Sequence, residues 1–256
     1  MAINNSPLST LNSQLFQRTR MLYGQQAMDR LSKSHVLFFG LGGVGGHCAE
    51  ALARCGIGRF TLVDGDRVSV SNINRQAVAL HSTVGLWKVD VMRGRILDIH
   101  PGATVRVIPQ FYPFGEEGSF EEGGLWAASY DIIVDAIDDI PTKVELAAQA
   151  RRRGIPMISS MGAGNKMDPA RFEAADLYET SVCPLARAMR RRCRERGIES
   201  LRVVYSKEPP VSLAEMHTNE TGRTTPGSVS FVTAAAGCVL AGEVVRMLLG
   251  GPEKAP

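Results

Sequence analysis

The chain has 256 residues, a net charge of +3 and an apolar fraction of 44%. At this length it could form one large domain or two small ones, and either could bury a sizeable core. Its cysteines form no C-x-x-C pair, which argues against a structural zinc site or a disulfide framework and favours a reducing cytoplasm. They are Cys48, Cys55, Cys183, Cys193 and Cys238.

The two ends of the chain predict no membrane insertion. Residues 1–12 are polar, and we expect them to be disordered rather than a signal peptide. Residues 228–250 are apolar, but Glu243 and Arg246 interrupt the run, and about 20 uninterrupted apolar residues are needed to cross a bilayer. This stretch therefore predicts a packed helix.

Residues 15–31 have a helical pattern that carries Arg18 and precedes the first predicted strand. A solvated surface helix would show the same pattern. The sequence V-L-F-F-G-L-G-G-V-G-G, residues 36–46, then predicts a buried strand that turns sharply into a helix.

The glycines of this turn match the G-x-G-x-x-G pattern of nucleotide sites. Gly40 permits the tight turn, Gly42 and its neighbour Gly43 let the backbone approach a phosphate, and Gly45 lets helix and strand pack closely. The helix N-terminus would favour the anion. Because glycine clusters also mark ordinary turns, the pattern alone does not decide between a nucleotide site and an ordinary turn.

A second buried strand, residues 60–64, ends in Asp64 at about the 20-residue spacing at which such folds place a carboxylate on a ribose hydroxyl. A turn or capping role for Asp64 is the alternative. The polar segment that follows predicts nucleotide contacts or a hydrogen-bonded turn. Its candidate residues are Asp66, Asn72, Asn74, Arg75 and Gln76.

Lys88 begins the next predicted helix, which runs to Pro101. A cation at this end opposes the helix dipole, and a bound phosphate would explain it. After strands at residues 105–108 and 131–135, Asp138 and Asp139 precede a helix that begins near Pro141. Helix capping explains one of them, whereas two carboxylates near a phosphate suggest a Mg²⁺ ligand.

The alternation of strands and helices, with a further strand at residues 155–160, predicts a Rossmann-like, mostly parallel sheet with helices on both faces. We expect one domain, with a core at about residues 15–165 and a C-terminal extension at about 166–256 that completes the sheet. Ligands of such folds collect at the carboxyl ends of the strands.

The extension contains a predicted arginine-rich helix at residues 184–196, followed by a loop at 207–227 that we expect to be mobile. Four arginines share one face by their helical spacing, which is typical of a solvated face or of a phosphate-rich partner such as RNA. They are Arg187, Arg190, Arg191 and Arg194.

Four motifs in order resemble the adenylating domain of the ubiquitin-activating-enzyme superfamily. They are G-L-G-G-V-G-G, D-G-D-R-V-S-V-S-N-I-N-R-Q, G-L-W-K-V and D-A-I-D-D. The resemblance covers roughly residues 18–164 and implies that Asp64 holds the ATP ribose and that Asp138 ligates Mg²⁺. It also implies phosphate contacts from Asn72, Arg75 and Lys88.

Arg18 is similar to the arginine that this superfamily supplies from the second subunit, so the resemblance also implies a homodimer. In the extension, S-M-G-A-G-N-K-M-D-P-A-R-F, C-P-L-A-R-A-M-R-R-R-C-R, V-V-Y-S-K-E-P-P and P-G-S-V-S-F-V resemble the branch that dehydrates threonylcarbamoyladenosine in tRNA. In that branch the second segment usually begins with an aspartate, where this chain has Cys183.

The resemblance implies ATP-dependent cyclisation of the modified nucleoside through an acyl-adenylate, with tRNA as the partner and room for a sulfur-relay protein. Two rival readings remain: an adenylyltransferase that activates a small sulfur-carrier protein, and an NAD(P)-dependent oxidoreductase. The absence of zinc-binding C-x-x-C pairs argues against the first. Arg75, Lys88 and Asp138 argue against the second, because hydride transfer needs no metal.

Overall fold

The computed structural model describes residues 14–113, 122–216, 218 and 225–250. The predicted N-terminal tail and a central part of the predicted loop 207–227 lie outside the described residues, so neither expectation is tested.

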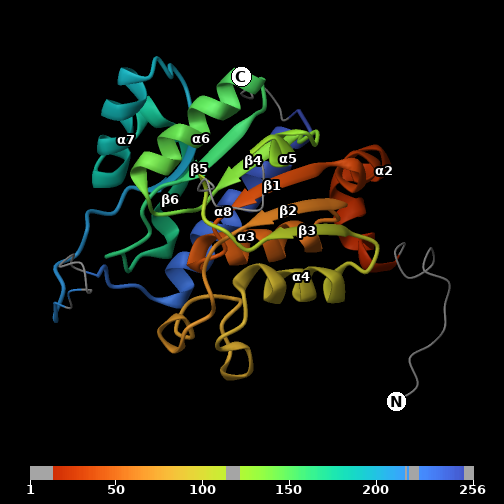
Figure 1. Ribbon diagram of the computed structural model, residues 1–256, viewed down its shortest axis with the longest axis horizontal. Helices are drawn as coiled ribbons and strands as arrows, with labels where there is room; N and C mark the ends of the chain where they lie inside the picture. The colour runs from red at the N-terminus through yellow and green to blue at the C-terminus, as the bar shows by residue number, and fades with distance from the viewer. Residues whose placement is uncertain (1–13, 114–121, 217, 219–224, 251–256) are drawn as a thin grey trace.

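A seven-stranded sheet forms the centre of the described structure, in the order β3-β2-β1-β4-β5-β7-β6 (Figure 1). The neighbouring pairs are parallel except for β6, which runs antiparallel to β7 at the edge. The strands are β1 (His35–Phe39), β2 (Arg59–Val63), β3 (Thr104–Ile108), β4 (Ile132–Asp135), β5 (Met157–Ser160), β6 (Phe172–Asp176) and β7 (Arg202–Ser206). The predicted Rossmann-like sheet is confirmed.

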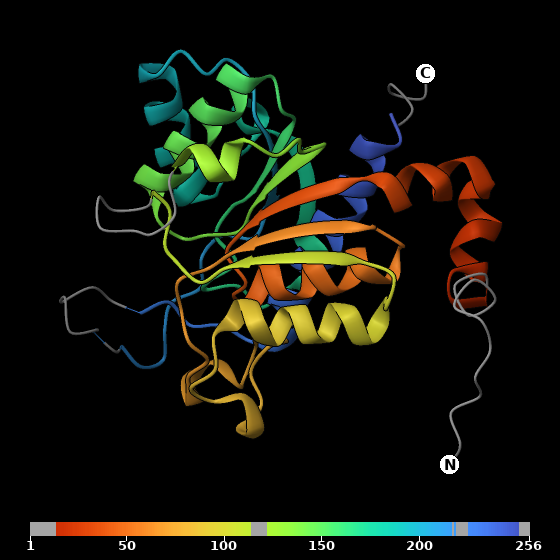
Figure 2. The same ribbon diagram turned by 45° about the vertical axis from the view of Figure 1, so that its right-hand side comes forward.

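Helices cover both faces of this sheet (Figure 2). They are α2 (Gln17–Lys33), α3 (Gly43–Arg54), α4 (Lys88–Ile99), α5 (Glu122–Trp126), α6 (Ile140–Arg153), α7 (Pro184–Glu195) and α8 (Ser230–Leu248). Short 3₁₀ turns are η1 (Val70–Asn72), η2 (His81–Thr83), η3 (Pro169–Arg171) and η4 (Leu177–Glu179).

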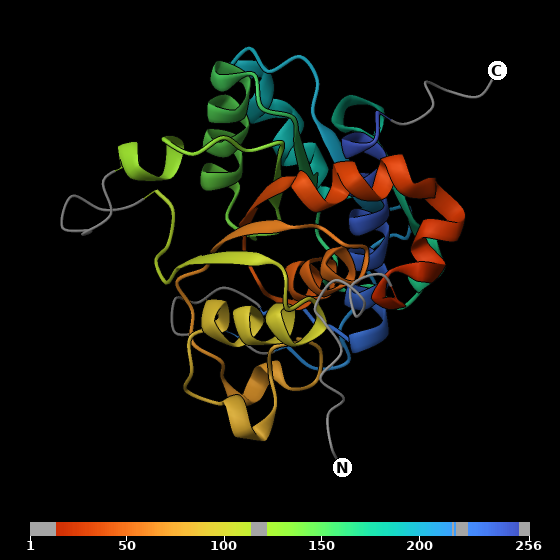
Figure 3. The ribbon, with the colours of Figure 1, turned by 90° about the vertical axis from the view of Figure 1, so that its right-hand side faces the viewer.

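Each face of the sheet has its own apolar core. One core is formed with α3, α4 and α8, and the other with α5, α6 and α7 (Figure 3). Strands β1 and β4 are buried on both faces, as their continuous apolar runs predict for a parallel sheet. Side chains of successive residues therefore enter opposite cores: Phe38 lies in the first and Phe39 in the second.

Local sequence explains how α6 is placed. The Asp139 carboxylate accepts a hydrogen bond from Thr142 N at 2.9 Å, so Asp139 is the N-cap residue. The capping role expected of one of the two aspartates is therefore present. Pro141 lies in the first turn, and Gly154 ends the helix in the left-handed conformation with φ 63°.

The apolar stretch at residues 228–250 is the packed helix that the sequence predicted. Among the described residues, α8 is the one helix that is both long enough and apolar enough to cross a membrane. Its side chains Val232, Leu240 and Val244 are buried in the core, and it packs closely along α3. A Cβ at Gly237 would approach the Val44 carbonyl oxygen to 2.6 Å, so glycine is what permits this approach.

The sequence did not predict β6 and β7, which extend the sheet beyond β5. The V-V-Y run of β7 is short and stops at K-E-P-P, and the F-E-A-A-D sequence of β6 carries two acids and two alanines. The Val and Tyr side chains of β7 favour a strand but over only three residues, whereas β6 has a weak strand signal, and the two strands pair through tertiary contact with the sheet. The extension is therefore part of the same sheet.

Candidate functional site

The candidate site lies where the strand order reverses. The chain leaves β1 for β2 and β3 on one side, whereas β4 and β5 lie on the other. In open parallel sheets the crevice for a ligand opens at the carboxyl ends of the two strands at this switch point. Gly40 follows β1, and Ala136 follows β4, so the glycine turn and the D-A-I-D-D loop lie where the fold rule places such a crevice.

The glycine turn has the geometry that its sequence predicts. Gly40 has φ 87°, and a Cβ there would lie 2.8 Å from the Ala136 carbonyl carbon. A Cβ at Gly45 would overlap the carbonyl oxygen of Gly40. By contrast, a Cβ at Gly42 would meet only Gln76 Nε2, at 3.9 Å, so the backbone at Gly42 is open to a ligand. Gly43 instead packs against Thr233 of α8.

We expect Gly45→Ala to destabilise the protein by about 1–3 kcal/mol and to weaken ATP binding, because the new methyl group forces the turn apart. Thermal unfolding and calorimetric ATP titration measure the two effects. Gly94→Ala on α4 is the control, since no atom lies within 4 Å of a Cβ there. That substitution should raise stability by about 0.5–1 kcal/mol. Equal behaviour of the two variants would contradict the role assigned to Gly45.

Asp64 connects the end of β2 to the glycine turn. Its carboxylate accepts hydrogen bonds from Leu41 N at 2.6 Å and from Asp66 N at 2.8 Å, and the side chain is buried. Burial raises the pKa of this carboxyl, against the lowering effect of the Lys88 charge and of the two N–H donors. The turn role considered from the sequence is thus present, and the carboxylate also lies beside the crevice, where a ribose hydroxyl could donate to it.

Lys88 lies at the start of α4 and is buried, with Nζ 2.6 Å from Asp66 Oδ2. This ion pair explains the unusual cation at a helix N-terminus without any ligand. Asp66 is 51% exposed, so the pair opens to solvent on the carboxylate side. A phosphate at this point could replace Asp66 at the ammonium group, because Asp66 can turn out into solvent. Lys88 is therefore still a candidate phosphate ligand.

The polar loop after β2 is held together by its own hydrogen bonds. Asn72 closes a capping box with Ser69, and Arg75 Nη1 donates to Ser71 O and Asn74 Oδ1, both at 2.9 Å. The hydrogen-bonded turn considered from the sequence is present. The guanidinium has five donors, so these two bonds do not exhaust it.

Gln76 is the residue of this loop that lies beside the backbone of Gly42. Its side chain is buried beside Gly42, and its Oε1 has no hydrogen-bond partner among the described residues. A buried amide oxygen without a partner costs about 1–3 kcal/mol. A polar ligand over Gly42 would offset that cost.

Helix α8 supports the same loop from behind. Asn74 Nδ2 donates to Ser228 O at 3.0 Å, and His47 Nε2 lies 3.2 Å from Arg75 O. Thr233 Oγ1 donates to the same carbonyl at 3.4 Å. The C-terminal helix therefore positions the backbone of Arg75 against α3.

Asp138 and Asp139 lie just past β4 and have separate roles. Asp139 caps α6, whereas Asp138 is exposed in the loop after β4. The described residues contain no group of three or more His, Cys, Asp or Glu side chains that could bind a metal alone. A single carboxylate beside a triphosphate fits Mg²⁺, which keeps several waters and binds one or two carboxylates plus phosphate oxygens.

Arg18 lies on α2, away from the candidate site of its own chain. Its neighbour Phe16 packs edge-to-face on His100, at the end of α4, with ring centroids 4.9 Å apart. That end of α4 lies at the amino edge of the sheet, opposite the glycine turn. The structure therefore does not bring Arg18 together with the other predicted site residues.

The arginine-rich helix α7 forms as predicted, but one prediction about it is wrong. Arg190 does not share the exposed face, because its Nη1 donates to the carbonyl oxygen of Thr180, at the end of η4, at 2.9 Å. Arg194 is exposed and also stacks on Tyr178, with Cζ 5.1 Å from the ring centroid. Arg187 and Arg191 are exposed. The helical spacing is correct, but Thr180 turns Arg190 towards the protein.

Cys183 precedes α7 and is only 2% exposed, within the core shared with α6. The backbone before it is strained, since Val182 has φ 61°, a conformation rare for a β-branched residue. A buried thiol is poorly placed to meet a substrate. The geometry gives this cysteine a packing role.

The sequence analysis missed a buried polar cluster behind the D-A-I-D-D loop. Lys143 and Asp135 are both fully buried, and Lys143 Nζ lies 2.9 Å from Asp135 Oδ2. Ser159 on β5 donates to the same carboxylate oxygen at 2.6 Å. The one available signal was a lysine within the apolar face formed by Val144 and Ala147.

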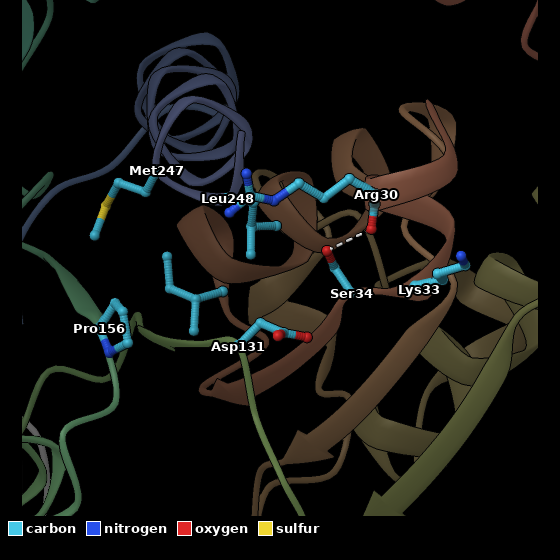
Figure 4. Close-up of a pocket in the computed structure, with 8 residues that line it drawn as sticks. Arg30, Lys33, Ser34, Asp131, Pro156, Met247 and Leu248 are labelled. Atoms are coloured by element: carbon cyan, nitrogen blue, oxygen red, sulfur yellow. Dashed lines mark hydrogen bonds between the residues drawn. The ribbon is translucent and has the colours of Figure 1, made fainter. Parts of the chain in front are cut away.

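A cavity of about 270 Å³ lies elsewhere, at the amino ends of β1 and β4 (Figure 4). Arg30, Lys33 and Ser34 line it from the end of α2, with Met247 and Leu248 from α8. Because the amino and carboxyl ends of parallel strands lie on opposite edges of a sheet, this cavity is separate from the candidate site.

Comparison with known proteins bears on this geometry. A family model described as the ThiF family matches residues 16–256. The tRNA threonylcarbamoyladenosine dehydratase of Bacillus subtilis (strain 168) is 41% identical over 244 residues, which make up 91% of this chain and 94% of the relative. The molybdopterin-synthase adenylyltransferase of Escherichia coli is 30% identical over 65% of this chain and 62% of its own length.

Solved structures agree with the sequence relatives. The crystal structure of E. coli tRNA N6-threonylcarbamoyladenosine dehydratase in complex with ATP has a TM-score of 0.82 and 32% identity, and the match covers 98% of both chains. The complex of the same protein with AMP has a TM-score of 0.83. The family model, which spans nearly the whole chain, shows that this chain belongs to the ThiF family.

Proposed function

We propose that this protein is an ATP-dependent dehydratase of threonylcarbamoyladenosine in tRNA, acting next to the anticodon. One observation carries the proposal. Beside the β1–β4 switch point, Asp64 bonds to a glycine turn whose backbone at Gly42 is open, and exposed arginines follow on α7, where Arg187, Arg191 and Arg194 form an arginine stripe. Relatives over nearly the full length bear this activity in their names, and one was crystallised with ATP and with AMP.

The first step is adenylation of a carboxylate. The threonyl carboxylate of the nucleoside attacks the α-phosphorus of ATP, forms a carboxyl–phosphate bond and releases pyrophosphate. Negative charge grows on the leaving group, where Lys88 and Arg75 are the available cations. Asp64 accepts a hydrogen bond from the ribose, and the N–H groups of the glycine turn with Gln76 hold the phosphates. Asn72 and Asn74 keep Arg75 in place.

In the second step the neighbouring carbamoyl group attacks the activated carbonyl carbon, the ring closes and AMP leaves. The carboxylate oxygen leaves with AMP, so the nucleoside loses one water overall. The two reacting groups belong to one nucleoside, and well-oriented intramolecular reactions have high effective molarities. This step needs no cysteine nucleophile, in keeping with the burial of Cys183.

Asp138 is the residue that would hold Mg²⁺ on the triphosphate. When bound, the ion neutralises phosphate charge and stabilises the leaving pyrophosphate. The exposed position of Asp138 just past β4 supports this role, because its carboxylate can face phosphate oxygens from solvent.

A homodimer would supply Arg18. Its position at the far edge of its own sheet leaves it unable to reach the triphosphate of the same chain. On α2 the exposed side chains Met21 and Leu22, at 79% and 83%, offer apolar surface to a second copy. Dimerisation, measured by sedimentation, should therefore accompany adenylation activity.

The arginine stripe of Arg187, Arg191 and Arg194 is the proposed tRNA contact. Helix α7 starts beside the loop after β5, where a Cβ on Gly162 would lie 3.7 Å from Leu185 Cβ. Arginines from this point onward can pair with backbone phosphates while the modified base enters the crevice. A cytoplasmic location and no membrane insertion fit this proposal.

Activation of a sulfur-carrier protein is the second candidate function, since the molybdopterin-synthase adenylyltransferase is a relative. It would use the same adenylation step on a protein C-terminus, and a sulfur-relay partner would then supply sulfur. The lack of C-x-x-C pairs and the arginine stripe favour tRNA.

Nucleotide analysis tests the choice. We expect AMP and pyrophosphate to form from ATP only when tRNA bearing threonylcarbamoyladenosine is present, and unmodified tRNA to be inert. Release of pyrophosphate with a sulfur-carrier protein and not with modified tRNA would favour the second candidate.

A further inference from the structure

The buried cluster of Lys143, Asp135 and Ser159 lies directly behind the loop that carries Asp138. Lys143 Nζ donates to Asp135 Oδ2 at 2.9 Å, to Ser159 Oγ at 3.2 Å and to Ser160 O at 2.8 Å. All three donor positions of the ammonium group are therefore used. Both charges of the pair are fully buried.

This arrangement is not needed to fill the core. Two buried charges lose their hydration, and replacing such a pair by apolar side chains of similar volume is often neutral or stabilising. A buried ion pair is thus weak evidence for a stability role. The hydrogen bonds of the pair also hold neighbouring backbone in place.

The cluster holds the backbone between β4 and Asp138. The second carboxylate oxygen of Asp135, Oδ1, accepts a hydrogen bond from Ile137 N at 3.2 Å. On the other side, Ala136 N donates to Phe39 O at 2.8 Å, and Gly40 lies against Ala136 and Ile137. The residue before Asp138 is therefore fixed between the ion pair and the glycine turn.

We infer that Lys143 is a positioning residue for the adenylation step, which acts through Asp135 and the Ile137 amide to aim the Asp138 carboxylate. Lys143 touches neither ATP nor metal. The inference rests on the proposed role of Asp138 at the triphosphate. Without the ammonium group, Asp135 becomes a buried carboxylate with an unpaired charge and turns towards water. Its hydrogen bond to the Ile137 amide is then lost, and the Asp138 carboxylate is no longer held in one direction.

The test is Lys143→Met in the full chain. We expect the Mg²⁺ concentration for half-maximal AMP formation to rise about tenfold, the scale typical of residues that orient a metal ligand. Hydrogen exchange at the Ile137 amide should accelerate in the same variant. Calorimetric titration of ATP at several Mg²⁺ concentrations measures the same requirement without tRNA.

Glu243→Gln is the matched control for lost stability. Glu243 is buried on α8, and its carboxylate lies 2.5 Å from Arg202 Nε, at the start of β7 and away from the crevice. This variant should lower the unfolding temperature and leave both the Mg²⁺ requirement and Ile137 exchange unchanged. If the two variants shift the Mg²⁺ requirement equally, or if Lys143→Met changes only the unfolding temperature, the inference is wrong.

Ser159→Ala perturbs the cluster without leaving an unpaired charge, and so provides the test if Lys143→Met fails to fold. It removes the 2.6 Å bond to Asp135 and should raise the Mg²⁺ requirement in the same direction by a smaller factor. An unchanged requirement would overturn the inference. If the wild-type protein binds Mg²⁺ and ATP but forms no AMP with modified tRNA, the proposed function fails, whereas binding and amide exchange still test Lys143.

Discussion

Asp138→Ala should slow adenylation at least about a hundredfold while the protein remains folded. The carboxylate is the proposed Mg²⁺ ligand, and a metal ion at a phosphoryl group supplies several kcal/mol of charge stabilisation in the transition state. A loss of about 3 kcal/mol is roughly a hundredfold in rate. Because Asp138 is exposed, its removal should change the free energy of unfolding by less than about 0.5 kcal/mol.

Pyrophosphate release under saturating modified tRNA measures this effect, and thermal unfolding checks the fold. Asp98→Ala is the control, because Asp98 is an exposed carboxylate near the opposite end of α4. It should retain the wild-type rate. Retained activity in Asp138→Ala would refute its assignment as the metal ligand.

The second large effect concerns the arginine stripe. Arg187→Glu combined with Arg191→Glu should weaken tRNA binding at least about tenfold. Each lost phosphate contact means that fewer counterions are released on binding, and each new glutamate repels the phosphates. The slope of log affinity against log salt should fall by about 1.4–1.8 for two contacts. ATP affinity should be unchanged.

Filter binding across a salt series measures the tRNA affinity, and calorimetry measures that of ATP. Arg93→Glu provides the control, because Arg93 is exposed on α4, on the other face of the sheet from α7. Its tRNA affinity should stay close to the wild-type value. Equal loss of ATP and tRNA binding in the double variant would indicate misfolding and contradict a surface role.

The sequence predicted most of the fold because local signals agreed with one another. The apolar run before Gly40, the proline at the start of α6 and Gly154 at its end each identify one element boundary. Strand β6 was missed because its sequence has a weak strand signal, and β7 because its strand-favouring V-V-Y run is only three residues long. Their pairing depends on contact with β5 and on each other.

Within the candidate site, the sequence predicted which residues lie near the crevice but not what holds them there. Lys88 is paired with Asp66, a contact across the loop that no helical or strand period encodes. The inward turn of Arg190 depends on Thr180, in a segment with no regular pattern. Lys143 was hidden because a single charge on an apolar helix face has no sequence partner until the sheet brings Asp135 and Ser159 to it.

Arg18 lies away from the candidate site of its own chain. Its segment is helical as predicted, but Gly24, with φ 79°, divides it into two helices, and the packing of Phe16 on His100 keeps Arg18 away from the candidate site. In the proposed homodimer, Arg18 of one chain reaches the site of its partner. Mixing an Arg18→Ala chain with an Asp138→Ala chain should therefore recover activity in heterodimers, each of which has one intact site.

The central claim is that the activated carboxylate belongs to a modified nucleoside in tRNA. Mass spectrometry of that nucleoside, after incubation of threonylcarbamoylated tRNA with the protein, ATP and Mg²⁺, tests it most directly. The account predicts that the nucleoside loses the mass of one water and that each loss is matched by one AMP. An unchanged nucleoside mass, with ATP and tRNA both bound, would contradict it.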